Sequence, residues 1–289
     1  MTSVRSSASI VMEFKQIRSR RGDRFGRFAS TLLFLCAASI AQAQVDRPTD
    51  SQLADITARG RALAAYDFAA WHGTDAVTPL KPTPGTVTRY IARETPKGWV
   101  VAFGRLTASR DTFLIAYEAV RTTTTGEFEG FTGVSHPKPV VDTGYFVHAA
   151  RAIDTATVEF GLVRRSYNVA ALPTSSGNWY VYLFPAPTIA GVWPLGADAR
   201  YLISADGRTI LERRQLHNSV IEFSASRVQK PAGSTMQAGF HTAVVAEIPE
   251  DTDVYHVLTR TPKVPEYVAT DHFIYRIDTD GKIIFFGTH

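Results

Sequence analysis

The chain has 289 residues, a formal net charge of +4, 45% hydrophobic residues and a single cysteine. This hydrophobic content excludes a disordered chain, and a mean hydropathy of −0.06 excludes a protein with many membrane spans. One cysteine can form neither an internal disulfide nor a cysteine-rich zinc module.

Residues 1–43 have the three parts of a secretory signal peptide. Seven Lys and Arg residues precede an apolar run from Phe28 to Ile40, and Ala41-Gln42-Ala43 then provides a small-residue cleavage site. The run is shorter than the ~20 residues that span a bilayer as a helix. We therefore expect export to the periplasm or beyond the cell, with no transmembrane span after cleavage; an uncleaved N-terminal anchor is the alternative.

Removal of this segment changes the charge and the thiol content. Seven basic and two acidic residues leave from the totals of 31 and 27, so the mature chain has 24 basic and 25 acidic residues. Cys36 leaves as well, which suits an oxidising compartment. A nearly neutral mature chain gives no general argument for binding nucleic acid or an anionic membrane.

A long helix is predicted at the start of the mature chain. Thr49 and Gln52 form a capping-box pattern, and apolar residues then recur at steps of three and four, which predicts an amphipathic helix ending near His72-Gly73. The prolines of Pro79–Gly85 predict a connector. The expected organisation is signal peptide (1–43), helix and linker (44–78) and a β-rich globular region (79–289), with a possible boundary near 185–196.

Most of the remaining chain has strand patterns. Alanines favour a further helix over Tyr145–Phe160, where a strand is the alternative. Asp206-Gly207 is typical of a type I′ hairpin. The predicted fold class is α+β, made mainly of antiparallel hairpins with an N-terminal amphipathic helix and few further helices. The expected strands are Trp99–Leu106, Thr112–Val120, Asn178–Phe184 with both faces buried, the two arms of Tyr201–Leu211, Phe273–Ile277 and Ile283–Phe286.

The common catalytic motifs are missing from the sequence. The chain contains no G-x-S-x-G, no phosphate-binding G-x-x-x-x-G-K-[ST], no G-x-G-x-x-G and no H-E-x-x-H. The residues Asp278–Gly281 begin like a calcium loop, but His289 stands at position 12 in place of glutamate, so a hairpin turn is the better interpretation. No catalytic residue is assigned.

One segment combines histidines with carboxylates. His241, Asp253 and His256 lie in Gly239–Leu258, and a strand ending near His241 followed by another beginning near Val254 would bring both histidines to one end of a sheet. Imidazole and carboxylate are ligands that zinc accepts. These three residues are the candidate metal ligands; the alternative is an acidic surface loop with two ordinary histidines. His217 follows a charged stretch and is expected to be solvent-exposed.

The letters GFHT, followed by Asp253, resemble the zinc motif of JAMM-type metallopeptidases over about 15 of the 289 residues. That family has His-x-His-Pro, then Ser, then Asp three residues later. His241 matches the first histidine and Asp253 the aspartate, with a spacing one residue shorter. Ala243 replaces the second histidine, Val244 replaces the proline, and no serine precedes the aspartate at the family's step. The resemblance implies a degenerate, inactive relative unless His256 supplies the missing ligand.

Two functions follow from these observations. The absent motifs favour an exported, non-catalytic module that binds an envelope protein, a peptide or a glycan, without nucleic acid. The alternative is a metal-dependent hydrolase or a degenerate JAMM-like domain built around His241, Asp253 and His256, with zinc as the metal.

Overall fold

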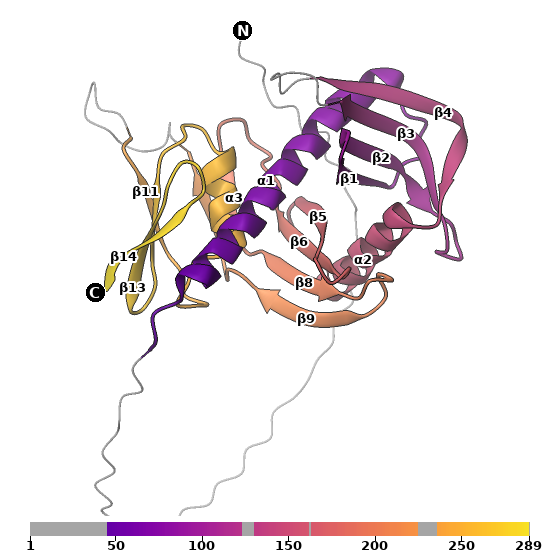
Figure 1. Cartoon of the computed structure of the whole chain (residues 1–289). Helices are drawn as coiled ribbons and strands as arrows, with labels where there is room; N and C mark the ends of the chain where they lie inside the picture. Colours follow the sequence, from indigo (N-terminus) through magenta and orange to yellow (C-terminus); the bar gives the residue numbers. More distant parts are fainter. Residues whose placement is uncertain (1–44, 123–129, 162, 225–235, 289) are drawn as a thin grey trace, which may run out of the picture.

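A computed structural model describes residues 45–122, 130–161, 163–224 and 236–288, which form three α-helices and 14 strands in four sheets (Figure 1). Within these residues the strand pairs are antiparallel with one exception, so the α+β class with antiparallel hairpins is confirmed. The predicted signal peptide, residues 1–43, lies outside the described residues. None of the described helices is long and apolar enough to cross a membrane.

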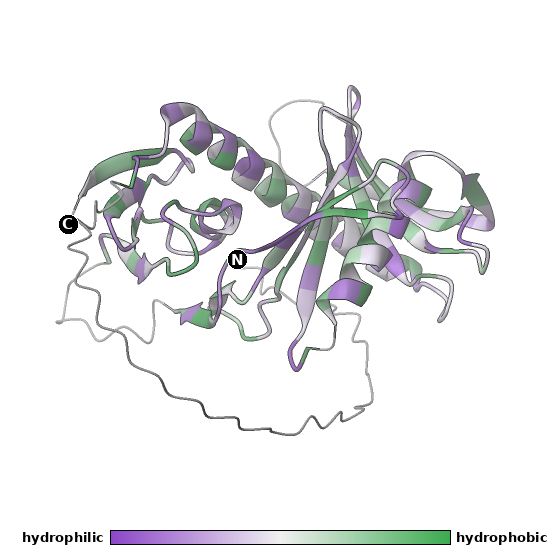
Figure 2. Ribbon diagram, turned by 90° about the horizontal axis from the view of Figure 1, so that it is seen from below, coloured by the Kyte–Doolittle hydropathy of each residue, from purple (hydrophilic) through white to green (hydrophobic). Residues whose placement is uncertain are grey.

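Helix α1 (Asp50–Val77) runs diagonally across the molecule and contacts both ends of it (Figure 1). Its N-terminus is closed by the predicted capping box of Thr49 and Gln52. Hydrophobic and hydrophilic residues alternate along the helix, as Figure 2 shows. The helix extends past the expected end at Gly73, because Gly73 is a packing position: a Cβ there would lie 2.8 Å from Val101 Cγ2.

Two antiparallel sheets form the larger part of the fold. The first has the order β1-β2-β3-β4 and the second the order β5-β6-β8-β9. Helix α2 (Tyr145–Phe160), which has the bounds predicted, packs between them in the largest apolar core. The strands of the first sheet are β1 (Arg89–Thr95), β2 (Gly98–Leu106), β3 (Phe113–Thr122) and β4 (Phe131–Asp142); those of the second are β5 (Tyr167–Pro173), β6 (Trp179–Pro185), β8 (Ala199–Ile203) and β9 (Ile210–Gln215).

Strand β6 lies inside the second sheet and is buried on both faces, as its aromatic sequence predicted. The turn between β8 and β9 is not type I′. Only Gly207 has a positive φ, +77°, whereas a type I′ turn requires positive φ at both central residues.

The C-terminal part is a third four-stranded sheet with the order β11-β12-β13-β14. Its strands are β11 (Gly239–Thr242), β12 (Glu266–Ala269), β13 (Phe273–Ile277) and β14 (Ile283–Thr288). Strands β11 and β12 are parallel, and helix α3 (Asp251–Thr259) connects them. The strand expected from Val254 is therefore wrong: parallel neighbours need a crossover connection, and a helix supplies it. A two-stranded antiparallel ribbon pairs β7 (Trp193–Gly196), which lies between β6 and β8 in the chain, with β10 (Val220–Phe223), which follows β9.

Helix α1 and helix α3 approach each other closely. A Cβ on Gly60 of α1 would lie 2.4 Å from Val254 Cβ and 2.6 Å from the carbonyl oxygen of Asp251. Only glycine fits at this contact, which fixes α3 and the residues on its first turn against the long helix.

Candidate metal centre

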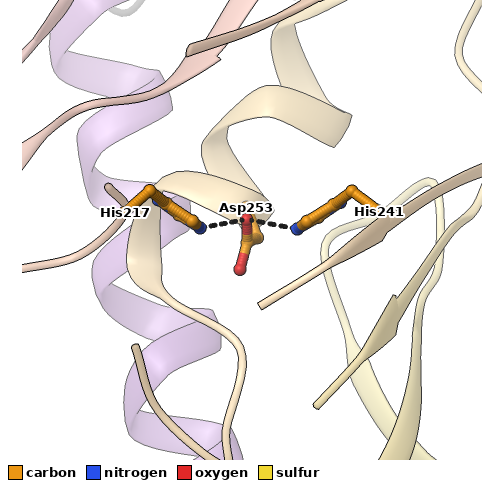
Figure 3. Close-up of side chains that lie close together, drawn as sticks. All are labelled: His217, His241 and Asp253. Carbon is orange, nitrogen blue, oxygen red and sulfur yellow. Dashed lines mark ion pairs between the residues drawn. The ribbon is translucent and has the colours of Figure 1, made fainter. Parts of the chain in front are cut away.

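Three buried side chains from three separate segments meet at one point. They are His217, after β9, His241 of β11 and Asp253 of α3, and one ligand atom from each lies within 4.8 Å of the others. Asp253 Oδ1 is 3.1 Å from Nε2 of His217 and 3.1 Å from Nε2 of His241 (Figure 3). The two imidazoles point at the carboxylate from opposite sides, as Figure 3 shows.

The orientation of His217 is fixed by a second carboxylate. His217 Nδ1 lies 2.8 Å from Asp198 Oδ1, and Asp198 is 1% exposed. The tight loop before β8 positions Asp198. This loop requires glycine at 196, because Gly196 has φ +97° and a Cβ on it would lie 2.1 Å from the carbonyl oxygen of Ser219. The backbone N–H of Leu216 donates to the Asp198 carbonyl, which holds His217 beside this loop.

His241 has the same arrangement with Glu266. His241 Nδ1 is 2.9 Å from Glu266 Oε1, and the other carboxylate oxygen accepts from the guanidinium of the fully buried Arg260. Gly239 makes room for this pair, because a Cβ on it would lie 1.9 Å from Glu266 Oε2. The glycine of the GFHT sequence is therefore a steric requirement of the site.

Asp253 is held by the start of α3. Its Oδ2 accepts a 2.7 Å hydrogen bond from the backbone N–H of Glu250, which is one half of a capping box, so that Oδ1 faces the histidines. The neighbouring Asp251 accepts hydrogen bonds from Arg59 of α1, Tyr182 of β6 and Arg200 of β8. These contacts anchor the helix N-terminus to two other parts of the fold.

The three candidate ligand atoms are buried polar atoms that face one another. Nε2 of His217, Nε2 of His241 and Asp253 Oδ1 make no aligned hydrogen bond within the described part of the chain, although they lie close together. An unsatisfied buried polar atom costs about 1–3 kcal/mol, so three of them at one point need a compensating interaction, which is either the charge of two protonated imidazoles facing Asp253 or a bound cation. A bound cation would satisfy all three.

The carboxylates control the charge of the two imidazoles in the metal-free protein. Burial lowers the pKa of each histidine, but Asp253 and the second carboxylate outweigh it and raise the pKa of His217 to about 11 and that of His241 to about 9. The two imidazolium neighbours hold the pKa of Asp253 well below its usual range, against the effect of its burial. Without a metal, both imidazoles are therefore protonated at neutral pH, and their positive charges balance negative charge of the carboxylates around them.

The structure brings together two of the three sequence-predicted ligands. His241 and Asp253 meet, whereas His256, one turn further along α3, is not part of the group within 4.8 Å. His217, expected on a solvated surface, is 8% exposed, so that expectation is wrong. Ala243, at the position of the second JAMM histidine, is buried in the apolar core of the C-terminal sheet. The second imidazole instead comes from a segment 24 residues earlier in the chain.

Glu250 is a further buried carboxylate beside this site. It is 3% exposed, and burial raises its pKa to about 7 although Arg214 donates a hydrogen bond to it. Its side chain also caps α3, because it accepts from the backbone N–H of Asp253.

Comparisons of the chain with protein-family models, with curated proteins and with solved structures found no match. The resemblance to JAMM-type metallopeptidases therefore stays limited to a few residues around His241 and Asp253, and the metal-centre geometry carries the functional argument.

Proposed function

We propose that this chain is a metal-binding protein whose His217, His241 and Asp253 hold one divalent transition metal, with zinc as the best match. The observation that carries the proposal is the direction of the two imidazoles. Each turns Nδ1 to a carboxylate and Nε2 to Asp253 Oδ1. When Nδ1–H donates to a carboxylate, Nε2 keeps the lone pair that a metal needs, and zinc-binding histidines usually donate Nδ1–H to a carboxylate or a carbonyl oxygen in this way.

The charges of the cluster support a divalent ion. Asp198, Asp253 and Glu266 contribute three negative charges, and Arg260 contributes one positive charge through its pair with Glu266. With both imidazoles neutral, the cluster carries two negative charges, which one divalent cation neutralises. Two nitrogens and one oxygen suit zinc, and the calcium and magnesium alternatives prefer oxygen ligands throughout.

A metal at this point would join parts of the fold that are far apart in sequence. His217 follows the second sheet, whereas His241 and Asp253 belong to the C-terminal sheet and its crossover helix. We therefore favour a structural role for the metal in an exported, non-catalytic module, with a peptide, glycan or envelope protein as its partner. Export and the partner remain proposals that rest on the sequence alone.

Zinc content tests the proposed centre. Metal-free protein loaded with Zn²⁺ and dialysed should retain about one ion per chain, measured by elemental mass spectrometry. His217→Ala, His241→Ala and Asp253→Asn should each lose most of it, because each removes one of three ligands. His272→Ala is the matched control, since His272 is an exposed histidine paired with Glu247 outside the cluster. A wild-type chain that retains no zinc would rule out the proposal.

A second function, metal-dependent hydrolysis, is favoured by the number of protein ligands and by Glu250. Three protein ligands leave one position of a tetrahedral zinc ion for water, whose pKa the metal lowers. Glu250, with its pKa near neutrality, could accept the proton. Zinc-dependent hydrolysis of a chromogenic ester that disappears in Glu250→Gln, at unchanged zinc content, would support this function. Equal rates in the presence of zinc and of a chelator would contradict it.

A further inference from the structure

Strand β11 is one edge of the C-terminal sheet, which lies at one end of the molecule (Figure 1). Its parallel ladder uses every second residue, because the backbone N–H groups of Gly239 and Ala243 both donate to the segment of β12. The N–H and C=O groups of Phe240 and Thr242 therefore point away from β12. Among the described residues, these four groups have no hydrogen-bond partner.

The side chains beside this open edge are exposed and mostly apolar. Burial alternates along the strand: His241 and Ala243 are buried, whereas Phe240, Thr242 and Val244 are exposed and project to the outer face of the sheet. Phe240 is 66% exposed and Val244 67%. The edge thus combines unpaired backbone groups with apolar surface that folding does not bury.

Two other edge strands of the molecule are protected against the addition of a further strand. Strand β4, at the edge of the first sheet, has the sequence Pro-Lys-Pro at 137–139, and β9, at the edge of the second, has Glu-Arg-Arg at 212–214. Prolines and charges on an edge hinder pairing with another chain. Strand β11 has the sequence GFHT, with no proline, lysine or acid, and its histidine faces the interior. Its edge is therefore open to pairing.

The open groups of β11 match the backbone of another extended chain. Phe240 and Thr242 each present one donor and one acceptor, and these repeat at every second residue, about 7 Å along the strand. An added strand supplies the complementary groups from its own backbone, whatever its sequence, and its alternate side chains give specificity. Because Phe240 and Val244 flank the edge and no charged side chain projects from β11, the added strand should be neutral and carry apolar side chains.

We propose that β11 is a peptide-binding edge, to which a neutral, extended polypeptide segment with apolar side chains at alternate positions adds as a fifth strand of the C-terminal sheet. This inference names the partner of the proposed binding module and rests on that part of the proposed function, but it does not require the metal. His241 lies between the two open positions and faces Asp253, so the edge and the metal centre are separate surfaces of one strand.

A fluorescent heptapeptide of alternating valine and threonine, with blocked ends, is the probe. Its fluorescence anisotropy is measured as full-length protein is added, and saturable binding is expected. The same peptide with every internal backbone nitrogen methylated keeps the side chains and loses the N–H donors. It should not bind, because an added strand is held mainly by backbone hydrogen bonds.

Two variants and one matched control place the peptide on β11. Thr242→Pro removes one open N–H and leaves the ladder with β12 intact, and Phe240→Thr removes the largest apolar side chain of the edge. Each should weaken binding by about tenfold. Phe286→Thr changes an exposed aromatic residue on β14, at the other edge of the same sheet, and should leave the affinity unchanged. Circular dichroism and thermal unfolding check that each variant is folded.

Binding at wild-type strength in both Thr242→Pro and Phe240→Thr, or to the fully methylated peptide, would overturn the proposed edge. A wild-type chain that binds no peptide and forms a concentration-dependent dimer, lost in Thr242→Pro, would assign the edge to a second copy and overturn the peptide partner. Zinc content is measured in the same samples. Protein that retains zinc but binds no peptide contradicts only this inference, and protein that binds the peptide without retaining zinc contradicts only the metal centre.

Discussion

At the scale of single residues, the two histidines of the centre depend on the carboxylates behind them. Asp198 and Glu266 each accept from Nδ1 of one histidine, which sets the tautomer and the ring orientation. Their surroundings differ: Glu266 shares its second oxygen with Arg260, whereas Asp198 Oδ2 has no partner among the described residues. Among the described residues, no second cation shares Asp198 with His217, whereas Arg260 shares Glu266 with His241.

Asp198→Asn and Glu266→Gln should each weaken zinc binding by about 10–100-fold without abolishing it, because these residues orient the ligands and do not touch the metal. Competition with a chromophoric zinc chelator measures the affinity. Glu222→Gln, a change at a half-exposed carboxylate that pairs with Arg165, is the control. If Asp198→Asn and Glu266→Gln both bound zinc as tightly as wild type, the proposed tautomers of His217 and His241 would be wrong.

The pH dependence of the metal-free protein follows from the same contacts. His217 and His241 have pKa values of about 11 and about 9 in the folded chain, above the value of about 6.5 for an unfolded histidine. A raised pKa stabilises the fold fully below pH 6.5, and this contribution is lost as the pH rises through 9 and then 11. With EDTA present, the free energy of unfolding in urea should therefore fall between pH 7 and pH 10.

Asp253→Asn should flatten this dependence, because the Asp253 carboxylate is the largest cause that raises both histidine pKa values. Bound zinc should flatten it as well, since its ligands are neutral imidazoles throughout the range. A metal-free wild-type protein that gains stability from pH 7 to pH 10 would contradict the charge state described for the cluster.

At the scale of elements, the contact between α1 and α3 positions Asp253. Gly60 lies in the middle of α1, where alanine is favoured intrinsically by about 1 kcal/mol. Gly60→Ala should nevertheless destabilise the fold by about 1–3 kcal/mol, because the added methyl group overlaps Val254 and the Asp251 carbonyl. Thermal and urea unfolding measure the change, and Asp55→Ala on the exposed side of α1 is the control. Higher stability in Gly60→Ala would show that the two helices are not in this close contact.

The elements set by local sequence were predictable, and those set by long-range contacts were not. Alanine-rich Tyr145–Phe160 and the hairpin of β2 and β3 follow from propensity and turn residues. Helix α3 was missed because its β-branched residues suit a strand equally well, and the parallel pairing of β11 with β12 decides in favour of a helix.

The candidate site was likewise predictable where it depends on a local segment and not where it depends on long-range contacts. His241 and Asp253 lie twelve residues apart, so one short segment rich in histidines and carboxylates predicts both as ligands. His217 follows three charged residues, Glu212, Arg213 and Arg214, and no local pattern separates it from a surface histidine. Its burial depends on Asp198 and Asp253, which lie 19 and 36 positions away in the sequence.

At the scale of the whole molecule, the candidate metal centre lies where the second sheet, the C-terminal sheet and helix α3 meet, and α1 contacts elements on both sides of it. Buried charge clusters contribute little net stability unless their charges are balanced. In this fold the balance comes from two protons or from one divalent cation, so the occupant of the centre determines how firmly the two parts of the chain are joined.

Zinc K-edge X-ray absorption of the zinc-loaded protein tests whether two histidines hold the metal, because it reports the ligands of the ion itself. The proposed centre predicts two imidazole nitrogens at about 2.0–2.1 Å, with the multiple scattering of two imidazole rings, and carboxylate or water oxygen at about 2.0–2.2 Å. A zinc ion bound without imidazole scattering, or with oxygen ligands alone, would rule out His217 and His241 as its ligands.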